Sequence, residues 1–245
     1  GVPLYVNAAM NSRGRKPGEY PSAGPLIHLK DIWHAAAPTL DFLSPDLYDP
    51  GFKDWTASYA TPDNTLFIPE IKRAEENAAQ AFYVFGEHNA IGLSPFSIEN
   101  STDGEDSRNV KGYRILRQLI PLITRHQKAA GKDGEREMNG LYFDHDSTTR
   151  VLHRDGMKIT ASHFFTLPWD PRAKESVWPA AGGVLIRLAP REYILAGSGI
   201  VVKFENENAE SDTRKLGEDG FLESGDAGRD ASASGNRKQS NGQRM

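Results

Sequence analysis

The sequence predicts an α/β fold in which buried parallel strands alternate with helices, followed by a smaller antiparallel β region. Short apolar runs recur in the first half and end in polar or aromatic residues, as in Leu40–Asp46 and Leu66–Glu70. Segments of helical character separate these runs. Strands of parallel sheets are buried on both faces, so they appear as nearly continuous apolar runs between helices. After residue 137, alternating segments replace this pattern.

The first half contains four strand-helix units. The expected strands are Leu4–Asn7, Leu40–Asp46, Leu66–Glu70 and Ala81–Gly86. The expected helices are Leu29–Ala37, Phe52–Tyr59, Ile71–Gln80 and Asn109–Ala130, the last with an apolar face of Ile115, Leu119, Leu122 and Ile123. Polar residues at strand ends suit either a (β/α)8 barrel or a doubly wound sheet. A barrel needs eight units, so half of one would be missing.

The second half follows a polar linker at residues 131–137. Gly, Pro and Asp stand at turn positions between the expected strands, which are Gly140–Phe143, Met157–Phe165, Gly183–Ala189, Tyr193–Ala196 and Ile200–Phe204. This pattern predicts a small antiparallel β domain. We therefore expect three parts: an α/β domain at 1–130, a β-rich domain at 138–205, and a low-complexity, disordered tail at 206–245 with too few large apolar residues to order itself.

Composition excludes several classes of function. The chain has 29 basic and 33 acidic residues, so it offers no basic face for a nucleic acid. Without cysteine there is no disulfide, thiolate metal site or cysteine nucleophile. No apolar run approaches the roughly 20 residues of a membrane span. The chain starts at Gly1 without a methionine, directly before an expected strand, so we expect a fragment.

Glu70 is the first candidate for chemistry. It ends an apolar strand directly after Pro69, where a carboxylate would lie at the mouth of a barrel. Active sites of barrel enzymes gather at the carboxyl ends of the strands. The alternative is an ordinary glutamate at a strand end, paired with Lys72 or Arg73.

Aromatic and hydrogen-bonding residues cluster at the other strand ends or in nearby loops. The candidates for substrate binding are Asn7, Asp46, Tyr48, Tyr83, Phe96 and Trp55, with Trp33 also in a loop. Sugars offer apolar C–H faces to aromatic rings and hydroxyl groups to amides and carboxylates, so this mixture favours a carbohydrate ligand. The alternative is that most of these aromatic residues belong to the core.

No metal or cofactor site is expected. Asp144, His145 and Asp146 are adjacent, but alternate side chains of an extended segment point in opposite directions, so a solvated turn is the better interpretation. The histidines lack the spacing of known metal-binding motifs. Ser198, between Gly197 and Gly199, lacks the spacing of a nucleophile elbow and indicates a turn.

Eight stretches carry a resemblance to a known family. They are LYVNAAM at 4–10, PSAGP at 21–25, LSPDLY at 43–48, LFIPE at 66–70, GLSPF at 92–96, TLPWDPR at 166–172, WPAAGG at 178–183 and EYILAGSG at 192–199. In order and spacing they resemble the bacterial type of glycoside hydrolase family 35 β-galactosidases, over roughly residues 2–205. The tail after about Lys215 departs from that family.

The resemblance implies the later strands of a (β/α)8 barrel, here a partial TIM barrel, followed by the β-rich domain of the same enzymes. It implies a retaining β-galactosidase in which Glu70 is the nucleophile that forms a covalent glycosyl-enzyme. Tyr48 would hydrogen-bond the nucleophile or the sugar. The partner would be a β-galactoside oligosaccharide or a polysaccharide side chain, and the compartment would be periplasmic or secreted.

Retention needs a second carboxyl group about 5 Å from the first. The resemblance places that acid/base on a strand that would precede Gly1. The Asn206–Glu207 pair matches the family's Asn-Glu dipeptide by accident, so the role is not transferred to it. A non-catalytic carbohydrate-binding protein, or an inactive remnant of such an enzyme, is therefore the second hypothesis, and the oligomeric state stays open.

Overall fold

The computed structural model describes residues 1–10, 24–100, 104–127 and 136–207, together with Gly14, Lys16 and Glu19. Residues 1–207 form one compact unit. Most of the polar linker and all but the first two residues of the expected tail lie outside the described residues. The same holds for the first three residues of the PSAGP stretch.

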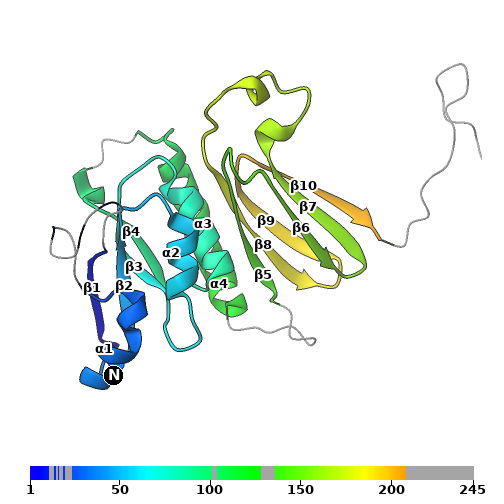
Figure 1. Ribbon diagram of the computed structural model, residues 1–245. Helices are drawn as coiled ribbons and strands as arrows, with labels where there is room; N and C mark the ends of the chain where they lie inside the picture. Colours follow the sequence, from blue (N-terminus) through cyan, green and yellow to red (C-terminus); the bar gives the residue numbers. More distant parts are fainter. Residues whose placement is uncertain are drawn as a thin grey trace, which may run out of the picture. The chain divides into compact units, whose positions relative to one another are not determined.

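The first half of the chain forms a four-stranded parallel sheet (Figure 1). Its strands are β1 (Tyr5–Ala9), β2 (Phe42–Leu47), β3 (Phe67–Ile71) and β4 (Gly92–Pro95), and their order in the sheet is their order in the sequence. Ala9 lies in register with Asp46, and Asp46 with Glu70, so the carboxyl ends of β1, β2 and β3 meet at one edge. The predicted α/β class is confirmed.

Helices separate the strands. They are η1 (Ile27–Leu29), α1 (Lys30–Ala36), α2 (Phe52–Tyr59), α3 (Asn77–Glu87), η2 (Ile98–Asn100) and α4 (Arg108–His126). The Ser107 hydroxyl caps α4 by accepting a hydrogen bond from the amide of Val110, which satisfies one of the free amides at the helix start. None of the helices in the described ranges is both long and apolar enough to cross a membrane.

Two predicted elements around α3 are wrong. The run Ala81–Gly86 is not a strand but the second half of α3, and Ile71–Gln80 is not a helix, because Ile71 ends β3 and α3 begins only at Asn77. The helix packs on the parallel sheet through Phe82 and Val84 and also contacts β5 (Met138–Phe143) and β8 (Ala181–Ala189), two strands of one antiparallel sheet. A helix buried on opposite sides loses its polar face, so its sequence resembles that of a buried strand.

The main core lies between the parallel sheet and its helices. Side chains of β2 and β3 contribute Leu43, Leu47, Ile68 and Ile71, which are all at most 3% exposed. They pack in one cluster with residues of α2, α3 and α4. A buried amide locks the loop before β3, because Asn64 exchanges hydrogen bonds with the backbone of Leu43.

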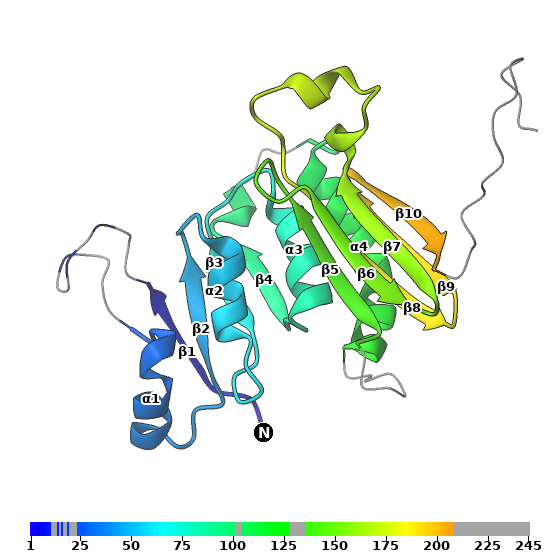
Figure 2. The same cartoon turned by 45° about the vertical axis from the view of Figure 1, so that its right-hand side comes forward.

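The second half forms two three-stranded antiparallel sheets (Figure 2). One has the order β5-β8-β9 and the other the order β10-β7-β6. The strands are β5 (Met138–Phe143), β6 (Thr149–Arg154), β7 (Met157–His163), β8 (Ala181–Ala189), β9 (Glu192–Ser198) and β10 (Ile200–Asn206), with short helices η3 (Phe164–Thr166) and η4 (Pro171–Lys174) between β7 and β8. The predicted antiparallel region is confirmed, but β6 was missed, because its half-exposed residues carry few apolar side chains.

Glycines let α3 lie directly on the backbone of β5 and β8. A Cβ atom added to Gly140 of β5 would stand 2.2 Å from the carbonyl oxygen of Tyr83, and one added to Gly182 of β8 would stand 2.5 Å from that of Ala79. Beside this contact, Glu87 of α3 accepts two hydrogen bonds from the guanidinium of Arg150. The helix therefore joins the parallel sheet to the antiparallel sheets.

Candidate active site at the carboxyl ends of β1 to β3

Four of the predicted site residues lie together at one edge of the parallel sheet. The Asn7 amide of β1 donates a hydrogen bond to Asp46 Oδ1 of β2, with Nδ2 and Oδ1 2.9 Å apart. The hydroxyl of Tyr48, directly after β2, donates a hydrogen bond to Oε1 of Glu70 on β3. Asp46 is the register partner of Glu70. Three neighbouring strands and the residue after β2 thus supply one polar group, made of two adjacent hydrogen-bonded pairs.

An irregularity in β3 turns Glu70 toward this group. Ile68 and Ile71 are both buried in the core, although residues three apart in a regular strand point to opposite faces. The pairing of β3 with β4 shifts register between these two residues, around Pro69. A bulge of this kind re-aims the side chains that follow it. Without the shift, Glu70 would share the face of Ile68 and point into the core.

The same face of the sheet is apolar toward the amino ends of the strands. Tyr5 stacks on Phe42 with ring centroids 5.7 Å apart, and Phe67 meets Tyr5 edge-on at 5.0 Å. Side chains two residues apart share a face of a strand, so Asn7 follows Tyr5 and Asp46 lies four residues beyond Phe42. Aromatic rings therefore cover this face near the amino ends of the strands, and the polar group lies on the same face at their carboxyl ends.

Asp46 is the most buried carboxyl of this group, with 8% of its surface exposed. Burial raises its pKa above the ordinary carboxyl value, and the negative charge of Glu70 adds to the increase, while the hydrogen bond from Asn7 opposes it. Asp46 and Glu70 are thus close enough to influence each other. Asp46 is suited to hold Asn7 in place through their hydrogen bond. Tyr48 is 46% exposed and is accessible from solvent.

Of the other predicted binding residues, Phe96 lies near the end of β3 and the rest lie on helices. Phe96 follows β4, is 53% exposed, and its amide donates to the carbonyl of Ile71, so it stands beside the end of β3. Trp33, in α1, packs partly buried against the main core. Its predicted loop position is therefore wrong.

Trp55 and Tyr83 lie on helices rather than in a loop or at a strand end. Trp55 is on α2 and packs against the main core, and its ring nitrogen is buried without a hydrogen-bond partner. Tyr83 is on α3, where its ring contacts those of Phe52, Tyr142 and His88. Burial raises the pKa of Tyr83 to about 12. The predicted position of Tyr83 at a strand end is wrong, because its segment is helical.

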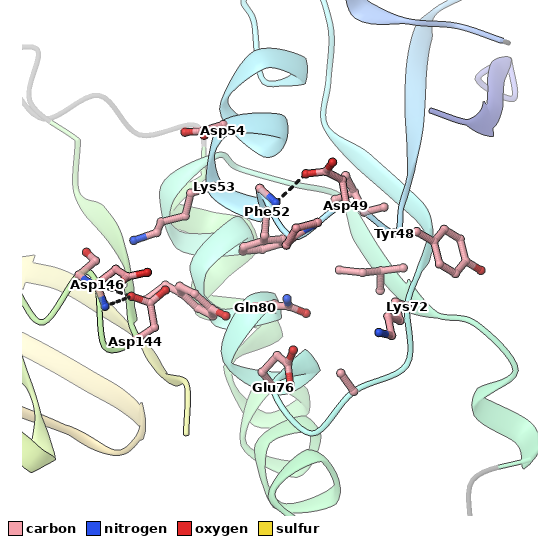
Figure 3. Close-up of a pocket in the computed structure, with 17 residues that line it drawn as sticks. Tyr48, Asp49, Phe52, Lys53, Asp54, Lys72, Glu76, Gln80, Asp144 and Asp146 are labelled. Carbon is pink, nitrogen blue, oxygen red and sulfur yellow. Dashed lines mark hydrogen bonds between the residues drawn. The ribbon is translucent and has the colours of Figure 1, made fainter. Parts of the chain in front are cut away.

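A groove of about 630 Å³ adjoins the Tyr48 side of the site (Figure 3). Its walls come from residues 47–54 after β2, from Ile71, Lys72, Glu76 and Gln80 at and after β3, and from Tyr142, Asp144, Asp146 and Ser147 at the end of β5. The sequence analysis missed this groove, because its walls come from residues 47–80 and 142–147, which only the fold brings together.

Asp144 and Asp146 form a turn at the edge of this groove. Asp144 Oδ1 accepts hydrogen bonds from the amides of Asp146 and Ser147, at 3.1 and 2.8 Å. The predicted solvated turn is confirmed. The Asn206–Glu207 pair lies at the end of β10, where Glu207 contacts the ring of His153.

One family model matches the chain. It describes a domain of unknown function, DUF5597, and matches residues 110–228, just under half of the sequence. The match begins in the first turn of α4, includes all six antiparallel strands and continues beyond Glu207. No curated protein matches the chain. The similarity thus concerns the antiparallel region and leaves the parallel sheet, with Glu70, outside it.

Proposed function

We propose that this chain belongs to a retaining β-galactosidase-type glycoside hydrolase resembling family 35, with Glu70 as its nucleophile. Its substrates would be terminal β-galactosides of oligosaccharides or polysaccharide side chains. The parallel sheet would supply later strands of a (β/α)8 barrel, and the face that carries Glu70 would be turned toward the barrel interior.

The observation that carries the proposal is the hydrogen bond from Tyr48 to Glu70. A nucleophilic carboxylate must present one oxygen to the anomeric carbon, and a hydroxyl donor on the other oxygen fixes that orientation. Asn7 and Asp46 form a second hydrogen-bonded pair on the neighbouring strands, with Asp46 in register with Glu70. The hydrogen bond from Tyr48 also argues against the alternative in which Glu70 pairs with Lys72 or Arg73. Arg73 Nη1 instead donates to the carbonyl of Ser97, and no ion pair of Glu70 with either residue is present among the described residues.

Hydrolysis needs a second carboxyl group to protonate the leaving oxygen. Asp46 is the register partner of Glu70, but it is buried and already accepts a hydrogen bond from Asn7. It is therefore poorly placed to reach a glycosidic oxygen. The proposal therefore assigns the acid/base role to a carboxyl group other than those of Asp46 and Glu70.

The test uses a substrate that does not need an acid. A 2-deoxy-2-fluoro-β-galactoside with a dinitrophenolate leaving group can transfer its sugar to a nucleophile without protonation of the leaving oxygen. The chain should gain the mass of one fluorogalactosyl group, and peptide mapping should locate that group on Glu70. Glu70→Gln should abolish the labelling, and Glu75→Gln, an exposed glutamate outside the site, should not change it. Labelling at another residue, or none, would contradict the assignment.

A second candidate function is carbohydrate binding without hydrolysis. The burial of Asp46 favours it, because this observation leaves Glu70 without an acid/base among its immediate neighbours. In that case galactose should bind and perturb Tyr48, whereas the fluorogalactoside should bind without becoming covalently attached. Mass spectrometry and a binding titration on the same sample separate the two functions.

A further inference from the structure

The parallel sheet ends in two strand edges that have no neighbouring strand. Within the described residues β1 pairs only with β2 and β4 only with β3, so β1 and β4 form the two borders of the sheet (Figure 2). An unpaired edge exposes backbone amides and carbonyls that can pair with a further strand. The strand order equals the chain order, as in a barrel of parallel strands. The sheet can therefore be extended at either edge without a change of topology.

The edge at β4 adjoins a second, apolar groove of about 520 Å³, called the α4 groove below. Its walls include Leu116, Ile120 and Ile123 on one face of α4, and Ala90 and Ile91 directly before β4. Ile91 and Ile120 are 56% and 57% exposed. Contiguous apolar surface that is open to solvent marks an interaction site.

The edge at β1 is apolar as well. Val2 and Leu4, at and before the start of this strand, are 87% and 56% exposed, and Ile32 on the following helix α1 is 66% exposed. Val6 packs against the main core on the helix-covered face of the sheet, and Leu4, two residues earlier, shares that face. The α4 groove opens on the same face, because its walls include residues of the main core.

The charges at the two edges are complementary. All the Asp, Glu, Lys and Arg positions of α4 are basic, and Arg117, which lines the α4 groove, makes no hydrogen bond or ion pair within the described residues. At the other edge, Asp31 of α1 is exposed and has no such partner in the same part of the chain. Opposite charges favour contact between unlike edges, and two α4 edges would repel each other.

We infer that two copies of this chain associate through these edges, with β4 of each beside β1 of the other, and close an eight-stranded parallel barrel. The inference rests on the proposed function, which turns the Glu70 face toward a barrel interior, and it names the partner that completes the barrel. A head-to-tail contact gives either a closed ring or an open-ended assembly. Each copy supplies four strands, half of a (β/α)8 barrel, so the ring closes after two copies. Leu4 and Val6 of one copy then lie against the α4 groove of the other.

The mass of the chain in solution tests this inference. Size-exclusion chromatography with light scattering should give the mass of a dimer. Ile120→Asp and Leu4→Asp each place a charge in the apolar contact and should weaken the dimer about tenfold or more. Val177→Asp is the control, because this residue is 77% exposed in the loop between β7 and β8 and should not change the dissociation constant. A monomeric parent chain, a larger open-ended assembly, or a dimer that neither edge variant weakens would overturn the inference.

Chemical cross-linking identifies the edges that meet. The chain has no cysteine, so single cysteines can be introduced without competing thiols. A mixture of Leu4→Cys and Ile91→Cys chains should be joined into a covalent dimer by a bifunctional maleimide. A mixture of Leu4→Cys and Val177→Cys chains should not, and equal yields would contradict the pairing of β1 with β4.

The label on Glu70 separates this inference from the proposed function. A dimer with the expected cross-link but no fluorogalactosyl label would support the pairing of the edges and reject the nucleophile. A labelled monomer would overturn the inference and leave the nucleophile in place. A monomer without label would reject both proposals.

Discussion

The Tyr48 hydroxyl donates a hydrogen bond to Glu70, linking the residue that follows β2 to the penultimate residue of β3. The two side chains meet because the parallel register places Asp46 opposite Glu70, and Tyr48 lies two residues beyond Asp46 on the same face. A hydrogen bond to a charged carboxylate is stronger than one between neutral groups. This contact is therefore the main constraint on the orientation of Glu70.

Removing the Tyr48 hydroxyl should slow the proposed reaction of Glu70. Tyr48→Phe should lower the rate of fluorogalactosyl labelling about 10- to 100-fold, because hydrogen bonds to charged groups contribute roughly 1.5–3 kcal/mol. The melting temperature should not change, since Tyr48 is 46% exposed. Tyr5→Phe removes a hydroxyl of similar exposure from the same face and should leave the rate unchanged. Equal rates in the two variants would show that the Tyr48 hydroxyl does not act on the reaction.

Asp46 should lower the stability of the fold at neutral pH. Its pKa is raised by burial, so between its ordinary and raised pKa values the folded state binds more protons than the unfolded state. Stability is then lost as the pH rises through this range. Asp46→Asn, which can still accept the hydrogen bond from Asn7, should increase the free energy of unfolding most at neutral pH. The gain should decline as the pH falls below the ordinary carboxyl pKa.

Denaturant unfolding at pH values from about 3 to 7 measures this effect, because carboxyl groups titrate in this range. Asp106→Asn, at a carboxyl that is fully exposed, should show no comparable pH dependence. The increase should also be smaller in a chain that carries Glu70→Gln, because the charge of Glu70 contributes to the raised pKa. A gain that is the same at every pH would argue against ionisation as its cause.

Gly140 should tolerate no side chain. In Gly140→Ala the new Cβ would stand 2.2 Å from the Tyr83 carbonyl oxygen, and backbone atoms on both sides would have to move. Overpacking of this kind costs about 1–3 kcal/mol of unfolding free energy. Gly104→Ala is the matched control, because its Cβ would meet no atom within 4 Å. If both variants unfold at the same denaturant concentration, α3 does not lie directly on β5.

The pair of Glu87 and Arg150 should contribute measurably to stability. The Glu87 carboxylate accepts hydrogen bonds of 2.7 and 3.1 Å from Arg150 and one of 3.2 Å from the Gly140 amide. Glu87→Gln should lower the free energy of unfolding by about 1–3 kcal/mol, as expected when a partly buried charged group loses its partners. Glu205→Gln disrupts an exposed pair with Lys203 and should have no measurable effect. Equal losses in the two variants would contradict this reasoning.

The sequence was sufficient where local pattern and burial agree. Helix Phe52–Tyr59 was predicted with its exact ends, and three of the four parallel strands lie where the apolar runs placed them. The position of Glu70 at the end of a strand followed from the same runs. These elements could be predicted because the spacing of apolar residues along each one shows whether it buries one face or both.

Only the tertiary structure decided how these elements act together. The run Ala81–Gly86 is helical because α3 is buried between the parallel sheet and the antiparallel strands, which a short apolar run cannot reveal. The register shift around Pro69 turns Glu70 out of the core and toward Tyr48. The groove lined by Lys53 and Asp144 joins segments far apart in the chain. The sequence determined which residues could carry chemistry, and strand register and packing determined which of them meet, because these depend on contacts between distant segments.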